Sequence, residues 1–312
     1  MPLDAGHQPV LLGEAVAALN IRPEGVYVDG TYGRGGHAAR MLALLGRRGR
    51  LLVIDKDPEA IRDARQRFGA DGRLLAWQGS FACFNQALAE CGLPGQVDGL
   101  LLDLGVSSPQ LDDPQRGFSF MRDGALDMRM NPGQGESAAV WLATAGEAEI
   151  ADVLWRYGEE RFSRKIARAI AAFRQDRPLE RTSQLAGLVA QVVPGREPGK
   201  HPATRSFQAI RIRVNRELED VEACLKHAVG TLTSGGRLVV ISFHSLEDRI
   251  VKQYLRQQSS PPRVPRGLPL TTDQLTGHPA LRLVGRAVRP GLAETGLNPR
   301  ARSAIMRVAE KC

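Results

Sequence analysis

Short apolar runs alternate with amphipathic stretches over the first hundred residues. Four of these runs have the length of buried strands and are bounded by polar residues: Gly25–Asp29, Arg50–Asp55, Leu74–Trp77 and Val97–Asp103. The stretches between them have helical spacing: Gly36–Leu45, Pro58–Phe68 and Ala82–Cys91. Because strands joined by helical crossovers pair in parallel, this part of the chain predicts an α/β fold.

The strand–helix alternation stops after the fourth strand. The pattern is then helical, with expected helices at Ser137–Thr144, Ala148–Tyr157, Glu159–Phe173, Ser183–Val193 and Ala203–Val229. An apolar strand returns at Gly235–Ser242, and Ser303–Ala309 alternates like an edge strand. We therefore expect a discontinuous α/β domain, residues 1–111 and 216–312, with an inserted helical domain at residues 112–215. Five prolines between Gln258 and Ala280 predict a mobile loop.

The 312-residue chain lacks the marks of a secreted, membrane or metal-stabilised protein. Its apolar runs are too short to span a bilayer, and its first twenty residues do not resemble a signal peptide. The four cysteines are scattered and form no C-x-x-C pair, which argues against a zinc site or a disulfide framework. We expect a cytoplasmic protein without a metal, and no sequence signature defines an oligomer.

Two segments concentrate the positive charge of the chain, whose formal net charge is +8. Residues 161–216 hold 13 Lys and Arg against 3 Asp and Glu, and residues 256–311 hold 10 against 3. Local basic segments of this kind are typical of surfaces that bind polyanions. The candidate RNA contacts are one set at helical steps and a second cluster: Arg161, Arg164, Lys165 and Arg168, then Lys200, His201, Arg205, Arg211 and Arg213.

A glycine-rich turn follows the first expected strand. Residues 29–37 read DGTYGRGGH, and Gly33, Gly35 and Ala38 fit a loose dinucleotide fingerprint with Asp55 twenty residues after Gly35. Glycines at such a turn let the backbone approach a ligand closely. This pattern alone leaves open a nicotinamide dehydrogenase, an S-adenosylmethionine protein or a plain tight turn.

Three acids distinguish these alternatives. Asp29, Asp55 and Asp103 each end an expected strand, so all three should face one crevice at the carboxyl ends of a parallel sheet. Carboxylates suit a cofactor that carries an ammonium and a sulfonium, whereas they repel a pyrophosphate. The acids therefore favour S-adenosylmethionine over a nicotinamide dinucleotide.

Eight strings in the sequence together resemble one family. They are DGTYGRGGH at 29–37, LLDLGVSSPQLD at 101–112, RGFSFMRD at 116–123, LDMRM at 126–130, YGEER at 157–161, KHPATR at 200–205, ISFHSLEDR at 241–249 and NPRARS at 298–303. The chain resembles the RsmH/MraW family of bacterial 16S rRNA cytosine-N4 methyltransferases from His7 to about Glu310.

The resemblance implies a class I, Rossmann-like methyltransferase sheet with an inserted all-helical domain. It implies transfer of a methyl group from S-adenosylmethionine to the exocyclic N4 of a cytidine in the decoding region of 16S rRNA, on the small ribosomal subunit. The cofactor contacts that it implies are Gly35, Gly36, His37, Asp55, Phe81, Asp103 and Gln110. Asp29 and Gly33 join this set through the acid and glycine patterns described above.

The candidate catalytic residues are Asp103 and His244. An acceptor bonded to the amino group can localise the nitrogen lone pair, and His244 follows a strand end. The Pro-Pro-aromatic sequence that often follows such an acid is absent, so Phe118, Phe120 and Phe243 are candidates for stacking the base. No cysteine lies near the relevant strand ends, which disfavours methylation at C5. A non-catalytic ribosome-binding or assembly protein with a cofactor fold remains the alternative.

Overall fold

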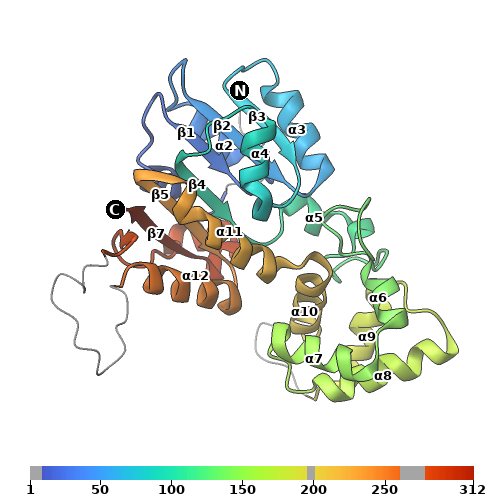
Figure 1. Ribbon diagram of the computed structural model, residues 1–312. Helices are drawn as coiled ribbons and strands as arrows, with labels where there is room; N and C mark the ends of the chain where they lie inside the picture. The colour runs from blue at the N-terminus through green and yellow to red at the C-terminus, as the bar shows by residue number, and fades with distance from the viewer. Residues whose placement is uncertain (1–8, 195–200, 261–277) are drawn as a thin grey trace, which may run out of the picture. The chain divides into compact units, whose positions relative to one another are not determined.

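The computed structural model describes residues 9–194, 201–260 and 278–312 (Figure 1). The chain divides into a sheet unit, residues 1–105 and 218–312, and a helical unit, residues 106–217. The sequence-based boundaries lay at 111/112 and 215/216. Residues 106–111 fall in the helical unit because helix α5 (Ser108–Asp112) contacts the 3-10 helix η2 (Pro114–Arg116).

The sheet unit contains a seven-stranded sheet in the order β3-β2-β1-β4-β5-β7-β6. Its strands are β1 (Val26–Asp29), β2 (Arg50–Asp55), β3 (Leu74–Gln78), β4 (Val97–Asp103), β5 (Leu232–Ser242), β6 (Leu281–Leu283) and β7 (Ile305–Lys311). Strands β1 to β5 pair in parallel, and β7 runs antiparallel to β5 and β6. The carboxyl ends of β1, β2, β4 and β5 therefore share one edge, here called the carboxyl edge. The predicted α/β fold is confirmed.

Helices cover both faces of the sheet. They are α1 (Leu12–Ala18), α2 (Gly36–Leu42), α3 (Pro58–Phe68), α4 (Phe84–Glu90), α11 (Glu217–Thr231), α12 (Ser245–Gln258) and α13 (Leu292–Leu297), with 3-10 helices η1 (Phe81–Cys83) and η4 (Pro299–Ser303). Alternate strand residues point to opposite faces: Leu51 packs in the core with α1, α2 and α3, and Leu52 packs with α4, α11 and α12. Burial of each such Leu side chain stabilises the folded state by roughly 1.5–3 kcal/mol relative to leaving it exposed.

The helical unit has its own core. Its helices beyond α5 are α6 (Ala138–Thr144), α7 (Glu147–Gly158), α8 (Ser163–Asp176), α9 (Thr182–Val192) and α10 (Thr204–Asn215). Helix α7 packs against α8 and α10, around buried Trp141, Leu154, Ile166 and Ile210. None of the helices within the described ranges is both long enough and apolar enough to cross a membrane.

Several sequence-based boundaries were wrong for backbone reasons. The single helix expected at Ala203–Val229 is two, because Arg216 adopts a left-handed conformation (φ 53°) between α10 and α11. Glu159 is also left-handed (φ 50°), so the next helix begins at Ser163. Strand β7 is not an edge strand, since β6 pairs with its outer side. The loop expected at Gln258–Ala280 lies largely outside the described residues.

Candidate functional site

Three aspartates stand at the carboxyl edge, where β1, β2 and β4 end. The register pairs Asp29 with Val53 on one side and with Leu101 on the other. In each strand the residues just before the final aspartate are apolar, so a polar side chain comes where the strand leaves the core. The structure thus brings Asp29, Asp55 and Asp103 to one edge, as the sequence predicted.

Asp29 is fully buried at the start of the glycine turn. Its Oδ1 accepts a hydrogen bond from the Thr31 amide at 3.1 Å, and its Oδ2 has no partner within the described chain. Desolvation raises the pKa of Asp29 to about 7, and the nearby Asp55 carboxylate adds to this shift. An ionised Asp29 therefore requires a compensating cation.

Asp55 holds the glycine turn from the neighbouring strand. Its Oδ2 accepts from the Gly33 amide and its Oδ1 from the Asp57 amide, both at 2.9 Å. Burial raises its pKa to about 6. Gly33 and Gly35 have φ of 55° and 68°, so both use the left-handed region that glycine adopts without strain. A Cβ at Gly35 would also lie 2.5 Å from the Tyr32 hydroxyl.

Asp103 and His37 face each other beside this turn. His37 Nδ1 lies 3.6 Å from Asp103 Oδ2, and His37 is almost completely buried. Desolvation lowers the pKa of His37 to about 4, so its ring is neutral near pH 7. Desolvation also raises the pKa of Asp103, with further contributions from the Asp29 and Glu247 carboxylates. The pair is therefore not a stable ion pair in the ligand-free protein.

Unsatisfied buried atoms mark this edge as a ligand site. Within the described residues, Asp29 Oδ2, Asp103 Oδ1 and His37 Nε2 are buried without a hydrogen-bond partner. Buried polar atoms are rarely left unpaired, and such atoms gathered at one edge are typical of groups that await a ligand. Two carboxylate oxygens suit an ammonium group, so the residues present fit S-adenosylmethionine.

Two further cofactor candidates came only from the family resemblance. Phe81 begins η1 after β3 and is partly buried. A Cβ added at Gly30 would lie only 3.0 Å from the Phe81 Cβ, so Phe81 packs against the start of the glycine turn. Gln110 belongs to the helical unit, where its Oε1 accepts from the Ser107 amide at 3.0 Å and caps α5. Phe81 thus lies at the carboxyl edge, and Gln110 has a capping role in the helical unit.

The loop that carries Phe81 is anchored to α11. Asp220 Oδ2 accepts from Ser80 Oγ at 2.6 Å and lies 2.5 Å from Lys56 Nζ. Ser80 precedes Phe81 and Lys56 follows Asp55, so one carboxylate holds the loops after both β2 and β3. No local sequence signal predicts the role of Asp220, because its contacts join segments more than 130 residues apart.

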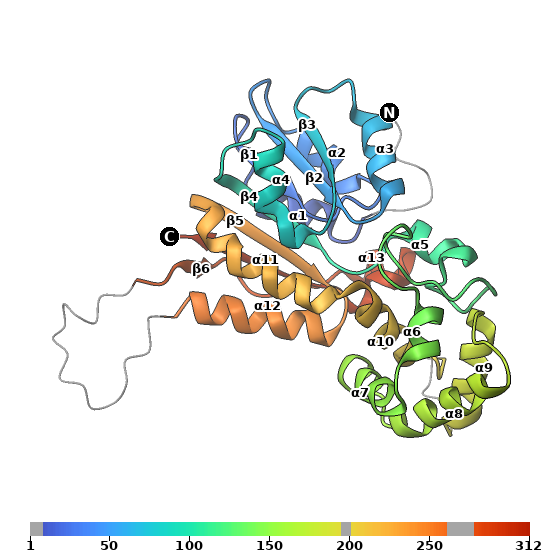
Figure 2. The same cartoon turned by 45° about the vertical axis from the view of Figure 1, so that its right-hand side comes forward.

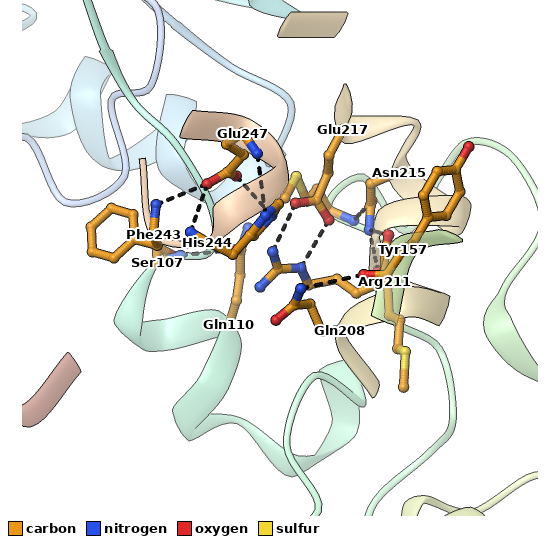
Figure 3. A network of polar contacts seen from close by, with 12 residues as sticks. Ser107, Gln110, Tyr157, Gln208, Arg211, Asn215, Glu217, Phe243, His244 and Glu247 are labelled. Carbon is orange, nitrogen blue, oxygen red and sulfur yellow. Dashed lines mark hydrogen bonds and ion pairs between the residues drawn. The ribbon is translucent and has the colours of Figure 1, made fainter. Parts of the chain in front are cut away.

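His244 caps helix α12. Its Nδ1 accepts from the Glu247 amide at 3.4 Å, and its Nε2 lies 3.2 Å from Glu247 Oε1 (Figure 3). Glu247 Oε2 in return accepts from the His244 amide at 3.3 Å, and also from the Phe243 amide at 2.8 Å. This reciprocal arrangement is a capping box. The geometry thus gives His244 a structural role at the end of β5.

The three candidate stacking rings lie in different environments. Phe243 is in the sheet unit, 3.6 Å from the Cβ position of Gly105, two residues beyond Asp103. Phe118 and Phe120 belong to the helical unit, where Phe118 is buried and Phe120 packs edge-on against Phe207. Phe243 is therefore the ring placed beside the strand that ends in Asp103.

One face of α8 carries the first basic set. Arg164, Lys165 and Arg168 are exposed, as is Arg161 before the helix, while Ile166 and its apolar neighbours point into the core. Arg168 has only a long, exposed contact with Glu147, at 3.7 Å. These four side chains thus form a solvated cationic face, here called the α8 face.

The second basic cluster is more closely tied to the helical unit. Arg211 makes a bidentate ion pair with Glu217 at 2.9 Å, and Arg213 contacts Glu149 and stacks over Trp141. His201 stacks on Phe120, and Arg205 is partly buried. Lys200 lies outside the described residues. Figure 3 shows Arg211 directed at Glu217, which assigns it to packing of this unit.

Comparisons with known proteins cover nearly the whole chain. A curated relative, ribosomal RNA small subunit methyltransferase H of Thioalkalivibrio sulfidiphilus (strain HL-EbGR7), is 61% identical over 305 residues, 98% of this chain and 97% of its own. An rRNA methylase from Streptococcus thermophilus has 10% identity and a TM-score of 0.43, with 98% of this chain and 97% of that chain covered. A candidate methyltransferase from Streptococcus mutans, solved with SAH, has a TM-score of 0.43 at 10% identity, with 98% and 99% covered. The profile of the MraW methylase family matches residues 4–312, and the chain belongs to that family.

Proposed function

We propose that the protein is an S-adenosylmethionine-dependent methyltransferase of small-subunit ribosomal RNA. We further propose that it methylates the exocyclic N4 of a cytidine in the decoding region of 16S rRNA. Family membership and the 61% identical relative support the reaction class and the RNA class. The choice of cytosine N4 rests on the family resemblance of the motifs and on the absence of a cysteine beside the strand ends.

One observation carries the cofactor assignment. Asp29 and Asp103 each present a buried carboxylate oxygen without a partner, and desolvation raises the pKa of both groups. A bound ammonium would restore the lost hydrogen bonds and favour both ionised carboxylates. The nearby Asp55 carboxylate, which already holds the turn, is placed to accept from ribose hydroxyls.

Asp103 is the proposed catalytic group. When bound, the cofactor supplies a methyl group on a positively charged sulfur. Asp103, in its ionised form, accepts a hydrogen bond from the target amino group. This bond reduces delocalisation of the nitrogen lone pair into the cytosine ring and so makes the nitrogen a better nucleophile. Methylation of the nitrogen would release one proton, and the Asp103 carboxylate would take it. The His37 ring beside it is neutral near pH 7 and so does not itself act as a competing cation at the carboxylate.

The α8 face is the proposed RNA-binding surface of the helical unit. Its exposed arginines and lysine would contact phosphates, which gives affinity and salt dependence without choosing the base. Base choice requires an unstacked cytidine to enter the site, with Phe243 as the ring in the sheet unit that could stack it.

Labelled methyl transfer tests this function directly. The acceptors are small ribosomal subunits, naked 16S rRNA and tRNA, all lacking the modification, followed by nucleoside digestion. We expect N4-methylcytidine from small subunits and none from tRNA. Absence of product on every acceptor, with S-adenosylhomocysteine binding intact, would instead favour a non-catalytic ribosome-binding protein. A rise in melting temperature with NAD but not with S-adenosylhomocysteine would overturn the cofactor assignment.

A further inference from the structure

The chain before β7 returns to the carboxyl edge. Strand β6 begins opposite the end of β7, where Leu281 pairs with Lys311, and the following residues run along β7 until Val288 bridges Met306. At its start, β7 pairs Ile305 with Ser242, the last residue of β5. Residues 284–304 therefore reach the carboxyl end of β5 at Val288 and end beside it, and Figure 2 shows α13 beyond that end.

This segment presents unpaired arginines to solvent. Val284 and Val288 pack against the core, whereas Arg286, Arg289 and Arg302 are exposed. Throughout the described ranges, none of these three arginines has an ion-pair or hydrogen-bond partner. By contrast, Arg282 in β6, just before the segment, is paired with Glu310. Within the described residues, the positive charge of these three arginines is thus uncompensated.

The same segment is connected to the glycine turn through residues 9–11. Glu294 is the only acid in residues 284–304, and its Oε1 accepts from the Leu11 amide at 2.7 Å. Two residues earlier, Pro9 packs so closely on Gly36 that a Cβ there would lie 2.1 Å from its Cγ. Helix α13 is therefore connected to the cofactor turn through residues 9–11, and its acid is used in that connection.

The acidic carboxyl edge would benefit from nearby positive charge when RNA approaches it. When ionised, Asp29, Asp55 and Asp103 make this edge negative, which suits a cationic cofactor but repels an approaching polyanion. A cationic rim offsets that repulsion and raises the local concentration of RNA. Arginine also binds phosphate oxygens in a bidentate manner.

We propose that Arg286, Arg289 and Arg302 form a second rRNA-binding surface, on the sheet unit, that holds phosphates next to the target nucleotide. The proposal rests on the proposed function. This surface is separate from the α8 face of the helical unit, because it lies on the sheet unit, which carries the three acids. The chemical partner is the ribose–phosphate backbone, so these contacts contribute affinity and position but no base selection.

A matched pair of double variants tests the surface. Arg286→Gln/Arg289→Gln removes two charges at the carboxyl edge, and Arg47→Gln/Arg48→Gln removes two exposed charges just before β2, at the opposite edge. Binding of unmodified 16S rRNA is measured by fluorescence anisotropy between 50 and 300 mM KCl. We expect the first variant to bind about tenfold more weakly at 100 mM and its salt slope to fall by about 1.4, for two lost single-strand contacts.

The control and a rescue variant define the outcomes. Arg47→Gln/Arg48→Gln should change affinity less than twofold, and Arg286→Lys/Arg289→Lys should recover most of the salt slope. S-adenosylhomocysteine affinity should be unchanged in all variants. Equal losses in the two Gln variants would overturn the surface proposal, as would an RNA that wild-type protein does not bind. RNA binding with the expected slopes but without N4-methylcytidine would overturn the proposed function and leave the surface supported.

Discussion

The amide of Asp103 donates a hydrogen bond of 2.6 Å to the Thr31 hydroxyl. This bond joins the end of β4 to the glycine turn after β1, and the Thr31 amide in turn donates to Asp29. One threonine therefore sets the separation of the two carboxylates whose free oxygens define the candidate cofactor site. Thr31 lies within the glycine-rich turn that the sequence analysis identified, but only the structure shows that its hydroxyl accepts a hydrogen bond from the end of β4.

Loss of that hydroxyl should weaken cofactor binding. Thr31→Val keeps the shape of the side chain but leaves the buried Asp103 amide unpaired, at a cost of about 1–3 kcal/mol. We expect the Kd of S-adenosylmethionine, measured by isothermal titration calorimetry, to rise about fivefold to tenfold. Thr31→Ser keeps the acceptor and should bind within about twofold of wild type. Equal affinity of the Val and Ser variants would contradict this role.

The stability of the ligand-free protein should fall as the pH rises from about 4 to about 7. Asp29 and Asp55 have folded-state pKa values near 7 and 6, above the ordinary 3.8, so the folded state binds more protons than the unfolded state across this window. Each group then lowers the unfolding free energy by up to about 1.4 kcal/mol per pH unit. His37, whose pKa is lowered to about 4 by burial, acts in the opposite direction below its ordinary pKa of 6.5, so the net fall is the carboxylate contribution minus that of one histidine. Urea unfolding at pH 4.5, 5.5, 6.5 and 7.5 measures this slope.

A cationic ligand should reverse the trend, because it favours the ionised carboxylates. The rise in melting temperature caused by S-adenosylmethionine should be larger at pH 7.5 than at pH 5.5. Asp29→Asn serves as the control, since it removes one of the titrating groups and should flatten the pH slope of the free protein. A variant with the wild-type slope would show that Asp29 does not titrate in this window.

Replacement of Asp103 separates binding from catalysis. Asp103→Asn keeps the volume but cannot take a proton, so we expect turnover at saturating cofactor to fall about 10²-fold to 10⁴-fold, the usual contribution of general base catalysis. Asp103→Ala should lower both turnover and cofactor affinity. Labelled methyl transfer gives kcat, and calorimetry gives the Kd. Wild-type turnover by Asp103→Asn at saturating cofactor would restrict Asp103 to cofactor binding.

The sequence predicted the sheet better than the helices, for a physical reason. Strands β2 and β4 are buried on both faces, so their apolar runs end abruptly at Asp55 and Asp103 and define their own limits. The break at Arg216 had no such signal, because a left-handed arginine interrupts a continuous helical pattern without a glycine or proline. Long-range contacts such as Ser80 with Asp220 depend on the tertiary fold alone.

Site residues divide in the same way. The positions of Asp29, Gly33, Gly35 and Asp55 at one turn could be predicted because positive-φ glycines and strand ends have local sequence signals, and their part in cofactor binding stays a prediction. His244 was expected to be catalytic because it follows a strand, but the same position is also that of a helix N-cap. Sequence position alone cannot distinguish these roles; the contact with the Glu247 amide shows the capping role, and the catalytic role stays a prediction.

His244 should tolerate a residue that preserves the cap. Asparagine is a good N-cap, so His244→Asn should keep the melting temperature within a few degrees and turnover within about threefold. His244→Ala removes the cap and should cost about 1 kcal/mol of stability, measured by urea unfolding. If His244→Asn is stable but loses more than a hundredfold in turnover, the histidine acts in catalysis as the sequence suggested.

Charge removal on the α8 face should weaken RNA binding without affecting the cofactor. Arg164, Lys165 and Arg168 are exposed, so Arg164→Gln/Lys165→Gln/Arg168→Gln should fold normally. Each lost phosphate contact lowers the salt slope by about 0.7, so the triple variant should lose about 2 in slope. The KM for small subunits should rise, while kcat and S-adenosylhomocysteine affinity should not change, because phosphate contacts position the RNA and do not touch the reacting atoms. Arg47→Gln/Arg62→Gln/Arg65→Gln removes three charges at exposed positions before β2 and on α3, and it is the matched control. An equal rise in KM for the control would show that overall charge, and not the α8 face, governs RNA affinity.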